Sequence, residues 1–317
     1  MSENSSIEWT DHTFNTHWGC SKISPGCDGC YAQALAKRFG YGWGDDAPKR
    51  EFGETHWNDL IRWDRKAAAD GVRRRVFTNS MSDLFDKFAP AGVRERHWQF
   101  VQRTPNLDHL LLTKRIGNVR SMVPAAWLEP GGWPSNAWIG ATVVNQEEAD
   151  RDIPKLLQLP APVRFLSVEP LLGLVDLSKE WLVPKSGGRY SFSSLPDEYR
   201  TRSVDLLDWV IVGGESGRGA RPMHPSWAHA LRDQCAAAGV PFLFKQWGEW
   251  QVTNVVAGGD LGADIRRDMV RIVKANGQPD GHFRRGDVLM RRVGKKAGGR
   301  LLAGLQHDGF PTGGRAA

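Results

Sequence analysis

Six short apolar runs recur along the chain, and a stretch with helical character separates most of them from the next run. The runs cover residues 74–78, 109–113, 137–142, 163–168, 209–213 and 241–245, and helices are expected over residues 31–39, 57–70, 91–104, 146–158 and 226–238. Nearly continuous apolar strands suit a parallel sheet that is buried on both faces. Together with a short strand near residues 7–14, the alternation predicts an α/β fold, a full or partial (β/α) barrel. An open doubly wound sheet is the structural alternative.

The organisation into domains follows from the length and from the distribution of charge. A chain of 317 residues can bury one large core, and we expect the barrel over residues 1–250, with a Ser- and Pro-rich insertion near residues 175–207. Residues 251–317 are expected to form a basic C-terminal extension, because residues 266–300 contain eleven Lys and Arg but three acids, in a chain of net charge +6. Such clustering fits a nucleic-acid partner, or a solvated surface whose cations pair with acids elsewhere in the fold.

Polar side chains follow the apolar runs at the point where each strand should end. In parallel α/β architectures the carboxyl ends of the strands carry the active site, so these side chains predict a polar pocket. The candidates there are Asn79, Ser82, Asp83, Lys114, Thr142, Glu169, Glu215, Ser216, Lys245 and Gln246, together with Arg218 and Arg221 of the following glycine-rich loop. Arginine and lysine suit carboxylate or phosphate groups, whereas the two glutamates suit either a cationic group of a ligand or a neighbouring arginine.

Three of the four cysteines, Cys20, Cys27 and Cys30, lie within eleven residues in the pattern C-x6-C-x2-C. No apolar stretch is long enough to predict a membrane span or a signal peptide, so we expect a reducing cytoplasm, where clustered thiols bind metals rather than form disulfides. An iron–sulfur cluster with one open iron is one interpretation. Zinc with His12 or His17 as its fourth ligand is another, and unligated thiols are the third. Cys235 lies in a predicted apolar helix and is expected in the core.

Several longer stretches resemble one protein family over nearly the whole chain. They are residues 7–32 with all three clustered cysteines, 165–173, 212–217 with 220–222, 245–248, 291–296 and 310–311. In these stretches the chain resembles the phage-associated three-Cys-motif family, whose members are radical-SAM-like and have no assigned reaction.

The resemblance implies a barrel of the radical SAM type with a [4Fe–4S] cluster on Cys20, Cys27 and Cys30, and S-adenosylmethionine on the open iron. Reductive cleavage would then yield a 5′-deoxyadenosyl radical for chemistry on an unknown substrate, such as a nucleotide or nucleic-acid component. In this interpretation the cofactor-binding side chains are Asn79, Ser82, Asp83, Thr142, Glu169, Glu215 and Ser216. The substrate-binding side chains are Lys114, Arg218, Arg221, Lys245 and Gln246. An external electron donor is also implied. An inactive radical-SAM-like scaffold that serves a partner protein is a further hypothesis. A zinc-stabilised nucleic-acid-binding protein without catalysis is the alternative.

Three features depart from the usual radical SAM pattern. Three extra residues separate the first two cysteines, and Gly29 stands before the last cysteine, where an aromatic residue is common. The Gly213-Gly214-Glu215 tripeptide also occurs late in the chain rather than after the second strand.

Overall fold

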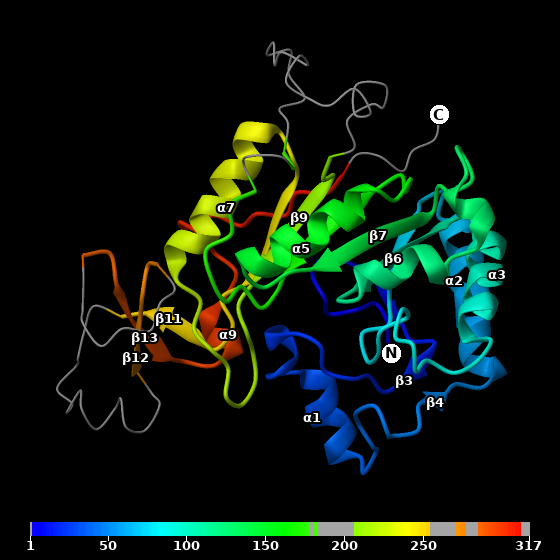
Figure 1. The fold of residues 1–317 in the computed structure, drawn as a ribbon, viewed down its shortest axis with the longest axis horizontal. Coiled ribbons are helices and arrows are strands. Elements are labelled where there is room, and N and C mark those ends of the chain that lie inside the picture. Colours follow the sequence, from blue (N-terminus) through cyan, green and yellow to red (C-terminus); the bar gives the residue numbers. More distant parts are fainter. Residues whose placement is uncertain (1, 178–180, 183–205, 254–269, 277–284, 312–317) are drawn as a thin grey trace.

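An eight-stranded sheet forms the centre of the computed structural model, which describes residues 2–177, 181–182, 206–253, 270–276 and 285–311 (Figure 1). In their order across the sheet the strands are β1 (Ser2–Glu3), β2 (His12–Phe14), β5 (Arg74–Thr78), β6 (Leu107–Thr113), β7 (Ala137–Thr142), β8 (Arg164–Val168), β9 (Trp209–Gly213) and β10 (Phe242–Gln246). Strand β1 is antiparallel to β2, and the other seven strands are parallel. The strand order follows the chain order without the reversal of a doubly wound sheet. The fold is therefore a partial (β/α) barrel, and the doubly wound alternative is wrong.

The predicted helices are confirmed and lie outside the sheet (Figure 1). They are α1 (Tyr31–Arg38), α2 (Glu54–Ala69), α3 (Val93–Arg103), α5 (Gln146–Leu157) and α7 (Pro225–Ala238), with a short α4 (Val119–Met122) besides. Helix α7 begins at a proline, whose fixed φ suits the first helical position, and ends where Gly239 takes the left-handed φ of 66°. Within the described ranges, no helix combines the length and the apolar character needed to cross a bilayer.

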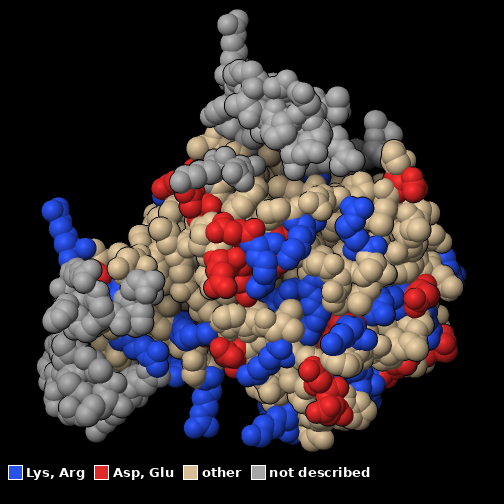
Figure 2. Space-filling view, in the orientation of Figure 1, with Lys and Arg blue, Asp and Glu red and all other residues tan. Residues whose placement is uncertain are grey.

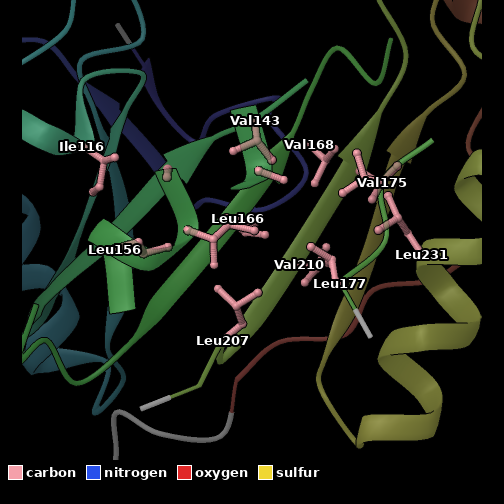
Figure 3. Packing of buried hydrophobic residues seen from close by; sticks show 14 of the residues in the cluster. Ile116, Val143, Leu156, Leu166, Val168, Val175, Leu177, Leu207, Val210 and Leu231 are labelled. Carbon is pink, nitrogen blue, oxygen red and sulfur yellow. The ribbon is translucent and has the colours of Figure 1, made fainter. Parts of the chain in front are cut away.

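The strands are buried on both faces because their side chains alternate between two cores. On β9, Val210 and Val212 face the outer core beneath the helices, whereas Trp209 and Ile211 face the inside of the barrel. The outer core gathers aliphatic side chains of the sheet, of α5 and of α7 (Figure 3). A third cluster packs α2 and α3 onto β2, β5 and β6.

The inside of the barrel is filled by large aromatic side chains over its lower part. These are Trp9, Phe77, Trp138, Phe165 and Trp209, with Leu110, Val163, Ile211 and Leu243 between them. Gly140 of β7 is required here, since an added Cβ would lie 2.4 Å from the Phe165 ring. Toward the carboxyl ends of the strands the inward positions become polar, as at Thr142 and Ser167. The aromatic layer thus forms the floor of a polar cavity.

The C-terminal part of the chain contains a second, smaller sheet. It has the order β11 (Trp250–Val252), β13 (Val288–Arg292) and β12 (Val270–Val273) and is antiparallel, and a short helix α9 (Lys295–Gly298) follows it (Figure 1). The last described residues return to the barrel, where the backbone of His307 and Gly309 bonds to β10 and the Phe310 ring lies 5.2 Å from Trp209. The basic extension is therefore partly a folded sheet whose end covers the edge of the barrel.

Several cations of the basic segment pair with acids. Lys274 bonds to Asp287 at 2.9 Å, Arg300 pairs with Asp308, and Arg292 lies 3.9 Å from Glu249. Arg266, Arg267 and Arg284 lie outside the described residues, as does most of the insertion predicted near residues 175–207. The described part therefore contains ion pairs of the kind that the paired-surface interpretation expects, and the nucleic-acid interpretation stays a prediction.

Candidate functional site

A cavity of about 700 Å³ opens at the carboxyl ends of the parallel strands. This volume lies in the range of sites for small molecules and cofactors, about 300–1,000 Å³. The predicted site residues that line it are Cys20, Cys27, Cys30, Asn79, Ser82, Asp83, Lys114, Thr142, Glu169, Glu215, Ser216 and Lys245. Arg218, Arg221 and Gln246 are not among the lining residues. The structure thus brings most of the predicted site to one place.

The cysteine loop connects the short strand β3 (His17–Trp18) to α1. Strand β3 pairs with β4 (Arg50–Glu51), and the side chain of Ser24 accepts a hydrogen bond from the Gly26 N–H. That bond caps a 3₁₀ turn over Pro25–Cys27, and Cys30 occupies the N-cap of α1. The extra residues between the first two cysteines therefore form an ordered turn, which directs the loop along the mouth of the cavity.

Gly29 is explained by its contact with Glu215. A Cβ at position 29 would lie 2.4 Å from Glu215 Oε1, closer than any real Cβ contact. The buried Glu215 carboxylate comes from the loop after β9 and occupies the space that a side chain before the last cysteine would need. The departure from the common pattern follows from this close approach.

Arg221 holds Glu215 and the cysteine loop together. Its backbone N–H and its Nε each donate to Glu215 Oε2 at 2.8 Å, and its Nη2 donates to Glu215 Oε1 at 2.6 Å and to the Pro25 carbonyl at 2.8 Å. The Nη1 atom of Arg221 lies 3.5 Å from Asp28 Oδ2. Arg221 thus clamps two loops, and Glu215 makes the arginine pair that was the alternative to ligand binding. That Arg221 binds substrate stays a prediction.

Glu169 is held in a similar way by the next strand. Lys245 Nζ donates to both oxygens of Glu169, at 2.7 and 2.9 Å, and Gln246 Nε2 approaches one of them at 3.4 Å. Gln246 is buried and also donates to the Gly214 carbonyl at 2.8 Å. Lys245 and Gln246 thus position Glu169 at the wall of the cavity, and their predicted contact with substrate stays a prediction.

Asp83 is the centre of a buried charge network beside Cys20. It accepts hydrogen bonds from Thr113 Oγ1 at 2.7 Å and from the Lys114 N–H at 3.2 Å, and Arg115 Nη1 lies 3.1 Å from its second oxygen. The same guanidinium donates to Cys20 Sγ at 3.6 Å and to the Ser21 carbonyl at 3.0 Å. Asp83 and Arg115 therefore connect the end of β6 to the first cysteine.

Asn79 and Ser82 connect the loop after β5 to the loop after β2. The Asn79 side chain accepts a hydrogen bond from the Thr16 N–H at 2.9 Å and donates to the Thr16 hydroxyl at 3.0 Å, and Ser82 donates to the His17 carbonyl at 2.8 Å. Asn79 also adopts a left-handed φ of 66°, which asparagine tolerates better than most residues. These bonds give both side chains a role in the architecture of the rim.

The remaining predicted residues differ in exposure. Thr142 is buried at the end of β7, Ser216 and Lys114 are half-buried at the cavity, and Arg218 is exposed outside it. Among the described residues, no carboxylate pairs with the Lys114 ammonium. Lys114 and Ser216 are therefore polar groups that the cavity can offer to a ligand.

Sequence reasoning missed several lining residues. They are Glu8, Lys22, Tyr31, Trp43, Arg115 and Lys295. Arg115 follows directly after the polar end of β6, so the same strand-end rule could have found it. Lys295 lies in the segment assigned to a separate extension, and only the three-dimensional fold brings it to the cavity.

The side chains that line the cavity suit an iron–sulfur cluster together with a cofactor that carries an ammonium group. Three thiols line it, and a guanidinium beside Cys20 is the kind of outer donor that tunes a ligating sulfur. Glu8 Oε2 is buried there without a hydrogen-bond partner in the described structure, which fits an ammonium group. Burial raises the pKa of the Cys20 thiol to about 12, with a further contribution from Asp83, so a bound metal would have to displace its proton.

The three cysteines line the cavity without forming a closed metal-binding group in the described structure. Across the described ranges, no three His, Cys, Asp or Glu side chains come together as such a group. The histidines considered as a fourth zinc ligand do not line the cavity: the His12 ring stacks on Trp63 at 4.6 Å, and His17 Nδ1 bonds to the Thr16 hydroxyl at 2.9 Å.

Comparisons with known proteins give a family match and a similar solved structure. Residues 4–311 match the model of a family described as a protein of unknown function, DUF5131. No curated protein matches the chain. Among solved structures, a mutant of spore photoproduct lyase is similar at 11% identity and a TM-score of 0.45, over 92% of this chain and 71% of that chain. At that identity and score the likeness does not extend to activity.

Proposed function

We propose that this chain, which belongs to the DUF5131 family of proteins of unknown function, is a radical-SAM-like iron–sulfur enzyme. The observation that carries the proposal is the position of the cysteine loop. Cys20, Cys27 and Cys30 line one cavity with the polar carboxyl ends of the parallel strands, where such architectures carry their chemistry. The phage association stays a prediction.

In this proposal Cys20, Cys27 and Cys30 would hold a [4Fe–4S] cluster, and the cavity that they line would hold S-adenosylmethionine. When bound, the two groups supply one-electron reduction and hydrogen abstraction, which protein side chains alone do not offer. An external electron donor supplies the electron. The chain itself supplies orientation and a protected pocket.

The side chains divide the work according to their existing bonds. Glu8 has a buried acceptor free for the ammonium of the cofactor, and Thr142 and Ser216 add polar contacts. Asp83, Glu169 and Glu215 are already paired with Arg115, Lys245 and Arg221, so in this proposal they fix the shape of the wall. Lys114 remains for an anionic group of the substrate.

The proposal is tested by S-adenosylmethionine binding and turnover with anaerobically reconstituted protein. Wild type should bind it and release 5′-deoxyadenosine under reducing conditions, and Cys27→Ser should release none. Glu8→Gln should raise the Kd for S-adenosylmethionine by roughly ten- to hundred-fold, because a charge-assisted hydrogen bond contributes about 1.5–3 kcal/mol. Cys235→Ser, in the core, and Glu147→Gln, on the exposed face of α5, are the matched controls. A reconstituted protein that neither binds nor cleaves the cofactor would contradict the proposal.

A further inference from the structure

An unusual group of exposed aromatic side chains borders the cavity. Among the large apolar side chains that are exposed in the described structure, four are aromatic, and three of them lie within residues 31–41: Tyr31 is 57% exposed, Phe39 58% and Tyr41 41%. Trp43 follows and lines the cavity with Tyr31. We call Tyr31, Phe39, Tyr41 and Trp43 the aromatic strip. Exposed aromatic rings in one patch indicate a binding surface rather than a core.

The aromatic strip is an ordered surface. The Tyr31 hydroxyl donates to the Ser80 carbonyl at 2.6 Å, which fixes its ring beside the cavity. Trp18 lies behind the strip, 5.1 Å from Tyr41 and 6.1 Å from Phe39 between ring centroids, and its indole N–H is buried without a partner in the described structure. Phe39 and Tyr41 thus pack against Trp18 and are still exposed.

Positive charge accompanies the aromatic strip. Lys37 and Arg38 are exposed in the last turn of α1, and within the described residues neither pairs with a carboxylate. The Arg50 guanidinium lies 5.0 Å above the Tyr41 ring. Figure 2 shows Lys and Arg side chains on the lower part of this face, with Asp and Glu side chains among them. Lys295, at the start of α9, reaches the cavity from the opposite side.

We infer that the aromatic strip binds single-stranded nucleic acid and presents one nucleotide to the cavity. Bases stack on exposed aromatic rings whatever their identity, and phosphates contact nearby cations. Lys114 and Lys295 at the cavity would meet the phosphates of the presented nucleotide. Aromatic and basic side chains are interleaved within residues 31–50, not within the basic segment 266–300. The inference names the substrate class and rests on the proposed function for its chemistry.

Binding is tested on the metal-free full chain by fluorescence anisotropy with labelled twelve-nucleotide probes. The arms are single-stranded DNA, single-stranded RNA and duplex DNA of mixed sequence. Wild type should bind a single strand more tightly than the duplex, with an affinity that falls as the salt concentration rises. Comparison of the two single-stranded probes shows whether DNA or RNA is preferred. Phe39→Ala with Tyr41→Ala should weaken binding at least ten-fold, since each stacked base contributes about 1–3 kcal/mol. Lys37→Glu with Arg38→Glu should also weaken it and reduce the salt dependence.

Lys87 and Phe88 provide the matched control, because the Lys87 ammonium lies 4.8 Å from the Phe88 ring, which is 41% exposed outside the aromatic strip. Lys87→Glu and Phe88→Ala should bind as wild type does. Unchanged binding by the Phe39→Ala, Tyr41→Ala protein, a preference for duplex, or no binding by wild type would overturn the inference. Nucleic-acid binding needs no cluster, so the two hypotheses can fail separately. Cleavage of S-adenosylmethionine without binding of single strands would contradict only this inference. Binding of single strands by a protein that carries no cluster would contradict only the proposed enzymatic function.

Discussion

Replacing Arg115 by Met should lower the free energy of unfolding by about 3–5 kcal/mol, the usual cost of removing one partner of a buried ion pair. The side chain of Arg115 is 8% exposed, and it lies 3.1 Å from Asp83 and 3.5 Å from Asp86, whose side chains are 7% and 1% exposed. Without the guanidinium, two carboxylates remain buried close together with no compensating charge. Denaturant unfolding of the metal-free protein measures the loss.

Two further variants make this result specific. Arg62→Met removes an ion pair with Glu3 from a side chain that is 58% exposed, and such exposed pairs contribute about 0–1 kcal/mol. Adding Asp83→Asn to Arg115→Met should restore part of the stability, because one buried charge is then removed. A loss for Arg115→Met no larger than that for Arg62→Met would show that the network does not stabilise the fold.

Arg115 also couples stability to the proposed chemistry. Its contacts with Cys20 Sγ and the Ser21 carbonyl fix the first half of the cysteine loop, whereas Arg221 fixes the second half through Pro25. Side chains that orient metal ligands from outside are worth about 10–100-fold in metal affinity. Arg115→Lys keeps the positive charge and should fold. Its ammonium group lacks the planar geometry by which the guanidinium contacts Cys20, Ser21 and Asp83 together.

Acid should destabilise the fold through two histidines in the core. His97 and His109 are fully buried, and their rings lie 5.2 Å apart. Burial lowers the pKa of His97 well below its usual value and the pKa of His109 to about 3. In the unfolded chain both take up protons near pH 6.5. Below that pH the unfolded state therefore binds protons that the folded state does not bind. Each histidine then lowers the free energy of unfolding by about 1.4 kcal/mol per pH unit.

His97→Phe isolates one of these histidines. In the described structure neither ring nitrogen of His97 has a hydrogen-bond partner, and its ring packs among aromatic neighbours such as Phe14 and Trp57. A phenyl ring should therefore cost less than about 1.5 kcal/mol at pH 8. At pH 5 the variant should have gained about 2 kcal/mol relative to wild type, compared with the difference at pH 8. Parallel pH profiles of unfolding for the two proteins would contradict this account.

The sequence was sufficient to predict the barrel because each parallel strand carries its own local signal. The run at 209–213 is apolar on both sides since Trp209 and Val210 face two different cores. The same strand-end rule brought Thr142, Glu169 and Glu215 to the cavity. The short spacing of Cys20, Cys27 and Cys30 predicted that they share one loop. In the fold this loop lies at the cavity formed by the strand ends.

Pairing between distant residues could not be read from the sequence. Glu169 and Lys245, or Asp83 and Arg115, come together only when neighbouring strands are in register, so Lys245 and Arg221 were assigned to substrate. The reason for Gly29 lies in the loop after β9, far along the chain. The charge of residues 266–300 can be counted in the sequence. The aromatic strip is recognisable only from the solvent exposure of its side chains, which the sequence does not give.

Metal and sulfide analysis of anaerobically purified protein tests the central claim most directly. The claim is that Cys20, Cys27 and Cys30 hold a [4Fe–4S] cluster at the mouth of the barrel. Wild type and Cys235→Ser should contain about four iron and about four sulfide per chain, and Ser variants of the three clustered cysteines should contain little of either. One zinc per chain without sulfide would contradict the claim and favour a zinc-stabilised nucleic-acid-binding protein.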